Sequence, residues 1–161
     1  MKNPFPYFAT AAALFLFGCG QSSQSGSEKT DSLAKLADTV ISTGCFKAVD
    51  QQDTASLSVN TLGDGKVKGR LLINFQEKGK NDGEIEGVYK GDTLFVDYTF
   101  KIGTTNETVY KNPLALLKKD GKLILGVGQI ETSLGRSYFV KGKPINFEKG
   151  RFTFAPVPCE Q

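Results

Sequence analysis

The stretch that decides the fold runs from Val67 to Ile102 and reads VKGRLLINFQEKGKNDGEIEGVYKGDTLFVDYTFKI. Apolar side chains occupy every second position near both of its ends: Val67, Leu71, Ile73 and Phe75, then Leu94, Val96, Tyr98, Phe100 and Ile102. A period of two places alternate side chains on one face of a strand, with polar residues on the other. The stretch therefore predicts an antiparallel meander with one apolar face.

Two glycine-containing turns set the register of this sheet. A two-residue turn at Gly91-Asp92 pairs Tyr89 with Leu94 and keeps apolar side chains opposite one another. Glycine in its first position is typical of a type II′ turn. Before the meander, a three-residue loop (residues 63–65) is required to place Val59 and Thr61 of the preceding strand on the same face as Val67. A slip of one residue would move every side chain to the other face. We therefore expect Gly65 in the left-handed conformation.

The rest of the chain extends the same pattern. Residues 77–83 are expected to form a charged hairpin loop, Pro113 to mark a strand edge or a bulge, and residues 123–130 to form a further strand. Glycines inside the predicted strands, at positions 69, 87, 126 and 128, suit the sharp bends of a barrel corner. The sequence thus predicts an all-β fold, a single antiparallel meander closing into a barrel of eight or nine strands, with a β-sandwich as the alternative.

The amino-terminal residues have the features of an export signal. Lys2 precedes an apolar run from Tyr7 to Phe17, too short to span a bilayer. The Leu16-Phe17-Gly18-Cys19 ending resembles a bacterial lipobox, which makes residues 1–18 a removed signal peptide and Cys19 the lipidated residue. An ordinary signal peptide, or a buried helix with an incidental cysteine, is the alternative. Residues 19–43 then form the lipidated Cys and a flexible tether, with either a short helix or more linker at 32–41, and residues 44–161 a β-barrel-like domain.

Cysteine and charge indicate the compartment and limit the partners. The chain has three cysteines; with Cys19 assigned to lipid, Cys45 and Cys159 remain as a pair that can form a disulfide in an oxidising compartment, or stay as free thiols. The net charge of +3, with both signs interspersed, argues against a nucleic-acid surface. With no histidine and no further cysteine, no metal site is expected.

Several segments resemble a family of small, uncharacterised bacterial envelope lipoproteins. The segments are Gly44-Cys45-Phe46, the run from Gly69 to Leu72, Gly91-Asp92-Thr93-Leu94 and Asp97-Tyr98-Thr99-Phe100, together with a cysteine near the carboxyl end. Such relatives often continue with a Ser-Glu-Gly segment, where this chain has Lys101-Ile102-Gly103-Thr104. The family has no established activity, so the resemblance implies location in the bacterial cell envelope and a single β-rich domain, and nothing catalytic.

The residues themselves favour a binding module over an enzyme. The chain lacks histidine, its serines lie in no nucleophile motif, and Glu84, Glu86 and Asp97 are placed by parity on the solvent face. We expect no catalytic residue and no cofactor. The favoured hypothesis is a membrane-anchored module that binds an envelope protein through loops such as 77–83 or 104–106. The alternative is a lipocalin-like carrier or sensor of a small apolar ligand, with Tyr89 and Tyr98 lining a pocket inside the barrel.

Overall fold

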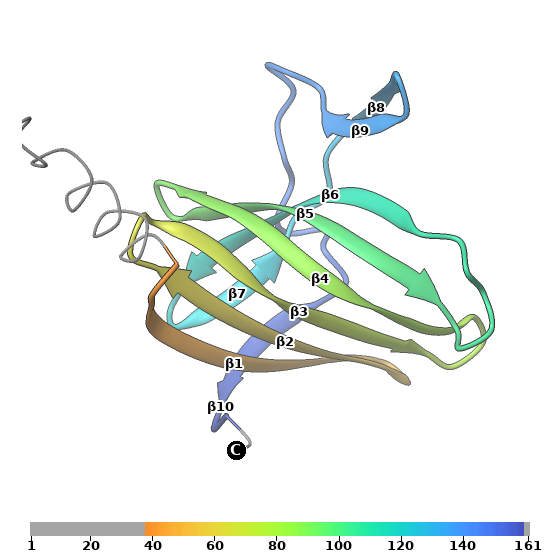
Figure 1. The fold of residues 1–161 in the computed structure, drawn as a ribbon, viewed down its shortest axis with the longest axis horizontal. Helices are drawn as coiled ribbons and strands as arrows, with labels where there is room; N and C mark the ends of the chain where they lie inside the picture. The colour runs from red at the N-terminus through yellow and green to blue at the C-terminus, as the bar shows by residue number, and fades with distance from the viewer. Residues whose placement is uncertain (1–37, 160–161) are drawn as a thin grey trace, which may run out of the picture.

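A computed structural model of the protein describes residues 38–159, in which every regular element is a β-strand (Figure 1). The ten strands, in chain order, are β1 (Val40–Asp50), β2 (Asp53–Leu62), β3 (Lys66–Phe75), β4 (Gly79–Lys90), β5 (Thr93–Ile102), β6 (Tyr110–Lys119), β7 (Lys122–Leu125), β8 (Ile130–Ser133), β9 (Arg136–Phe139) and β10 (Thr153–Val157). The predicted all-β class is confirmed.

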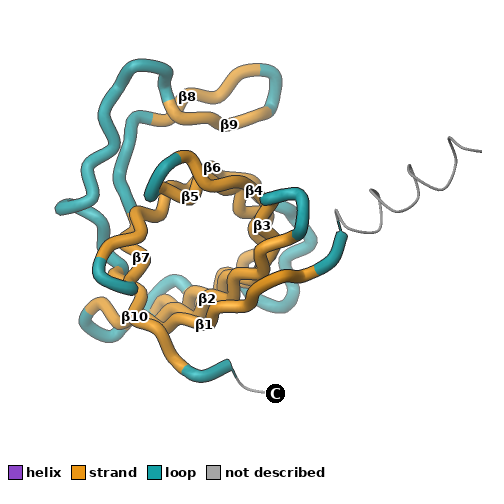
Figure 2. The backbone as a smooth tube through the Cα atoms, turned by 90° about the vertical axis from the view of Figure 1, so that its left-hand side faces the viewer, coloured by secondary structure: helices purple, strands orange, loops and turns teal. Residues whose placement is uncertain are grey.

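Eight of these strands close into an antiparallel barrel in the order β1-β10-β7-β6-β5-β4-β3-β2 (Figure 2). Strands β1 to β7 form the predicted meander, and β10 completes the ring by pairing with β1 on one side and β7 on the other. The barrel is confirmed and the sandwich alternative is wrong. Strands β8 and β9 form a separate two-stranded hairpin outside the ring, beside β6.

The register follows the two turns that the sequence singles out. Tyr89 pairs with Leu94 across the Gly91-Asp92 turn, where Gly91 has a φ of 59°. Thr61 pairs with Val67 across the three-residue loop. As a result Leu71 and Leu94 both face the interior, where they are almost completely buried.

The barrel interior is filled by apolar side chains from all eight of its strands. Among residues 38–159 no polar or charged residue is buried, and no buried side-chain nitrogen or oxygen lacks a hydrogen-bond partner. The buried core consists of Ala48, Ala55, Leu57, Val59, Val67, Leu71, Ile73, Ile85, Leu94, Val96, Tyr98, Phe100, Leu116, Leu123, Phe152 and Phe154. At roughly 1.5–3 kcal/mol for each large side chain, this burial is the main stabilising term.

Glycines inside two strands allow the neighbouring strands to approach closely. A Cβ on Gly69 would lie 1.9 Å from the carbonyl oxygen of Ser58, and one on Gly87 would lie 1.9 Å from that of Phe95. Both glycines lie inside strands, as predicted, and a side chain at either position would collide with the neighbouring strand. The prediction for Gly126 and Gly128 is wrong, because β7 ends at Leu125 and both lie in the connection that leaves the barrel.

The structure corrects three expected boundaries. Strand β1 begins at Val40 rather than near residue 44, because β2 pairs with it along its whole length, as far as Leu62. The last two residues of the possible helix 32–41 are therefore in a strand, and residues 32–37 lie outside the described part of the chain. The expected loop 77–83 is mostly the start of β4, because residues 79–83 pair with β3 from Leu71 to Phe75. Arg70 and Asp82 add a bidentate ion pair across the two strands at 2.9 Å. The expected strand 123–130 is divided between β7 and β8.

Pro113 occupies a strand edge, as predicted. Gly126 donates its N–H to the carbonyl of Ala115 at 2.8 Å. Ala115 and every second residue of β6 before it therefore point their backbone N–H and C=O groups away from β5. Pro113 is one of them, and β6 pairs with β7 only from Leu116 onward. A residue without an N–H at this position leaves no exposed donor for another chain to pair with.

Candidate interaction surfaces

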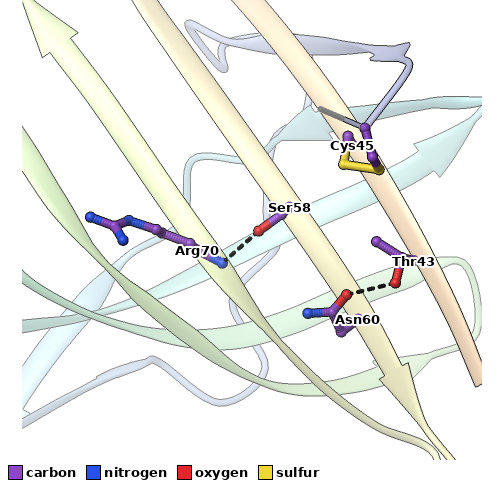
Figure 3. Close-up of a disulfide and its surroundings, with 6 residues drawn as sticks. Thr43, Cys45, Ser58, Asn60 and Arg70 are labelled. Carbon is purple, nitrogen blue, oxygen red and sulfur yellow. Dashed lines mark hydrogen bonds between the residues drawn. A yellow bond between two sulfur atoms is a disulfide. The ribbon is translucent and has the colours of Figure 1, made fainter. Parts of the chain in front are cut away.

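The disulfide joins the first barrel strand to the end of the described chain. Cys45 and Cys159 are bonded with their Cα atoms 5.2 Å apart and 114 positions apart in the sequence. Figure 3 shows the bond on the outside of β1, near two side-chain contacts that tie the strands together. The Thr43 hydroxyl donates to the side-chain Oδ1 of Asn60 at 2.9 Å, and the backbone N–H of Arg70 donates to the Oγ of Ser58 at 3.1 Å. Cys19 lies outside the described residues.

Tyr98 is a core residue rather than part of a pocket wall. Its side chain is only 3% exposed, its ring stacks on Phe100 with centroids 4.5 Å apart, and its hydroxyl donates to the carbonyl of Leu71 at 3.0 Å. Burial, aided by the nearby charge of Asp82, raises the pKa of Tyr98 above its ordinary value. The hydroxyl is therefore neutral and already bonded within the protein.

Tyr89 lies at one open end of the barrel, here called the mouth. It is 36% exposed, and partial burial raises the pKa of its hydroxyl. It borders a cavity of about 200 Å³ that does not include Tyr98 and is lined by Ser42, Thr43, Gly44, Phe46, Val59, Thr61, Tyr89, Lys118, Gly121 and Leu123. Ligand cavities are commonly about 300–1,000 Å³, so the mouth is small for a carrier.

Arg151 closes the opposite end. Its guanidinium lies 2.6 Å from a carboxylate oxygen of Asp50 and 2.6 Å from one of Asp53. The same group lies 5.9 Å from the ring centroid of Phe75 and 5.7 Å from that of Phe152. The arginine thus ties the segment entering β10 to the turn between β1 and β2, and it stabilises the closure of the ring.

The outer face of β2 to β6 carries paired charges over a shallow groove. Glu86 lies directly opposite Asp97 on one side and Lys68 on the other, and Lys111 forms an ion pair with Asp97 at 2.8 Å. Glu84 lies on this same face and is exposed. The groove measures about 570 Å³ and is lined by Ser58, Asn60, Lys68, Gly69, Arg70, Glu84, Ile85, Glu86, Asp97, Thr99 and Lys111. Within residues 38–159 no group of His, Cys, Asp and Glu is suited to hold a metal ion.

The β8–β9 hairpin projects from the barrel flank and carries exposed apolar side chains. Leu134 at its tip is 100% exposed and has a φ of 50°, in the left-handed region that leucine rarely adopts. The hairpin is held at its base, where the Phe139 ring packs so close to Gly128 that a Cβ there would be 2.8 Å away. Three further apolar residues in or just before the hairpin are exposed, namely Val127, Ile130 and Tyr138.

A second groove separates the hairpin from the barrel. It measures about 410 Å³ and lies over β5 and β6, lined by Asp97, Lys111, Ser133, Leu134, Arg136, Ser137 and Tyr138. It joins an apolar tip, an aromatic ring and both signs of charge on one surface. We refer to these seven residues together as the hairpin surface.

Sequence reasoning correctly turns Tyr98 toward the interior but assigns it to a ligand pocket, and it overlooks the hairpin surface altogether. Tyr138 lies there, whereas Tyr98 is buried. A signal was present in the sequence, since Leu134-Gly135 occupies the two central positions of a hairpin turn with positive φ at both. Asparagine or aspartate is the usual first residue in such a turn, so a leucine there is unusual.

No family model, no curated protein and no solved structure matches this chain. The class of protein is therefore defined by its architecture, a closed eight-stranded antiparallel barrel with a disulfide and an external hairpin. Over residues 38–159 the structure has no helix of the length and apolar character needed to cross a bilayer.

Proposed function

We propose that this chain is a lipoprotein of the bacterial cell envelope, anchored to a membrane by lipid on Cys19, and that it acts without catalysis by binding another envelope protein. The domain lies in the periplasm or outside the cell. The hairpin surface is the binding site.

The anchor and the compartment are supported by the sequence and by the disulfide. The lipobox-like segment ends at Cys19, and the two remaining cysteines are paired with each other. Disulfides of this kind persist in oxidising compartments such as the periplasm and the cell surface. The pairing also leaves Cys19 as the one cysteine available for lipid.

A surface function is supported by the packing of the interior. Tyr98, the deeper of the two candidate pocket residues, contacts Phe100 and bonds to Leu71 inside the core. The described residues contain no buried charged group that could serve as a perturbed acid or base. These two observations support binding on the outside of the barrel.

Leu134 is the observation that carries the proposal. The left-handed conformation costs a leucine about 1–2 kcal/mol, and full exposure returns no burial energy in the isolated protein. Asparagine would fit the same turn without that strain. A partner that covers Leu134 recovers roughly 1.5–3 kcal/mol of apolar burial, which offsets the strain.

The experiment places a photoactivated crosslinking residue at position 134 of the full chain in its own host. Val49 is the matched control because it is 68% exposed and lies at the far end of β1. We expect a discrete crosslinked protein from position 134 and none from position 49. Identical crosslinking patterns at the two positions would refute the hairpin surface as the binding site.

The variant Leu134→Asn separates binding from folding. It creates an Asn-Gly turn, which is expected to raise the free energy of unfolding by about 1 kcal/mol. The same substitution is expected to remove the apolar contact with the partner and to weaken binding at least tenfold. A variant that is more stable and binds equally well would show that the leucine has no part in recognition.

The carrier hypothesis has one observation in its favour, the cavity at the mouth beside Tyr89. Its walls include apolar side chains from β1, β2 and β7. A small apolar ligand that remains bound to the purified protein, and is lost with Tyr89→Ala, would favour that second function.

A further inference from the structure

Four exposed apolar residues gather around the mouth of the barrel. Val40 pairs with Leu62 and Val88 pairs with Lys66, so both lie beside the turn between β2 and β3. Ile41 and Tyr89 are their neighbours in sequence, and all four are exposed. Exposed apolar residues that share one end of a small domain mark an interaction surface.

Three lysines adjoin this apolar rim. Lys118 borders the mouth cavity, and Lys119 lies directly opposite Lys122 across the hairpin between β6 and β7. Like charges in directly opposite positions repel each other. Over residues 38–159 none of the three takes part in an ion pair, whereas Lys66 at the same end is paired with Asp64 at 2.8 Å. Asp92 and Asp120 lie in turns at this same end but form no ion pair with the three lysines, which therefore offer their ammonium groups to an anionic partner.

The chain also enters the barrel at this end. Gly63, in the turn between β2 and β3, donates its N–H to the carbonyl of Thr39 at 2.9 Å, just before β1 begins (Figure 1). Cys19 is 19 positions before Asp38, a length of chain that spans at most about 65 Å. The chain from Cys19 is therefore joined to the barrel at the mouth end and is long enough to let the mouth rest on the membrane surface.

We propose that the mouth rests on anionic phospholipid head groups of the membrane that holds the anchor. The inference rests on the proposed lipid attachment and adds an orientation to it. Lys118, Lys119 and Lys122 contact the head groups, while Val88 and Tyr89 enter the interfacial region, where tyrosine is favoured. The hairpin surface, on the flank of the barrel, is then held clear of the lipid and open to a protein.

The test uses the absence of tryptophan from the chain, so that one substitution introduces a single indole. Tyr89→Trp reports on the mouth, and Tyr138→Trp is the matched control on the hairpin, since these tyrosines are 36% and 44% exposed. The full lipidated chain is reconstituted in vesicles of phosphatidylethanolamine and phosphatidylglycerol with brominated acyl chains. Bromine quenches an indole that lies at the depth of the lipid. Val88→Trp serves as a second mouth probe if Tyr89→Trp disturbs the fold.

We expect strong quenching at position 89, or 88, and little at position 138. Replacing Lys118, Lys119 and Lys122 with glutamine is expected to shift the ratio of docked to undocked protein by roughly a hundredfold, about fivefold for each lysine. Equal quenching at positions 89 and 138, or no quenching in a protein that still floats with the vesicles, overturns the orientation. Failure to float together with an unmodified Cys19 contradicts the lipid anchor itself.

Discussion

Alanine at position 87 tests whether the glycines permit the bend of the barrel. Gly87 lies in β4, and a Cβ there would be 1.9 Å from the carbonyl oxygen of Phe95 and 2.7 Å from the Cα of Val96. Both contacts are with the backbone of β5, which cannot rotate aside as a side chain can. Gly87→Ala therefore requires one strand to move relative to its neighbour.

The size of the effect follows from that movement. Ordinary contact with a Cβ begins at 3.4 Å, so β5 must retreat by about 1.5 Å at this point. A shift of that size breaks two or three ladder hydrogen bonds, each worth about 1 kcal/mol, and leaves buried polar groups unpaired. We expect Gly87→Ala to lower the free energy of unfolding by about 3 kcal/mol or more, a large share of the 5–15 kcal/mol typical of a domain.

The assay is urea unfolding followed by far-ultraviolet circular dichroism, with Gly65→Ala as control. Gly65 has a φ of 82° but no atom within 4 Å of its Cβ position, so alanine there should cost only about 1–2 kcal/mol. The midpoint is expected to fall much further for Gly87→Ala, with an unchanged slope for any variant that still folds. If Gly87→Ala costs no more than Gly65→Ala, the close approach of β4 and β5 is wrong.

Two further predictions concern the disulfide and the carboxylate of Asp53. Replacing Cys45 and Cys159 together with alanine should lower the free energy of unfolding by about 5 kcal/mol in the chain-entropy model, because the bond closes a loop of more than 100 residues; thermal melting with and without reductant checks this, and an unchanged midpoint would contradict it. The pKa of Asp53 is held below its ordinary value, first by the N–H of Gln76 and then by Arg151. Because the folded pKa is the lower one, this stabilisation is present above about pH 4 and is lost as the pH falls through the folded pKa. Asp53→Asn should therefore lose less stability than the wild type between pH 5 and pH 2, and parallel curves of stability against pH would refute this.

Much of the fold could be predicted because it depends on local rules. The alternation from Val67 to Phe75 decides which face is buried, and the turn at Gly91 decides the register. Both depend on neighbours in sequence, and the structure reproduces them. The disulfide between Cys45 and Cys159 followed from counting cysteines once Cys19 was assigned to lipid.

The parts that could not be predicted depend on contacts distant in the sequence. Gly126 and Gly128 resemble strand glycines, yet Ile145 and Phe139 pack against them and the chain leaves the barrel there. The alternation predicts that Tyr89 and Tyr98 face the interior, but it does not predict how deeply each is buried. Burial depends on the distance of a residue from the open end of the barrel. The hairpin surface was missed because Asp97 of β5 and Lys111 of β6 meet the β8–β9 hairpin only in three dimensions.

Native mass spectrometry of the protein released from its own host membranes tests the central claim most directly, namely that the interior is packed and that binding takes place outside. The predicted result is a chain that begins at a lipid-modified Cys19, contains one disulfide, and carries either no adduct or a second protein that is absent from Leu134→Asn. A small molecule of stoichiometric mass that survives in the native state and is released on unfolding would contradict the packed interior. It would establish the barrel as a carrier instead.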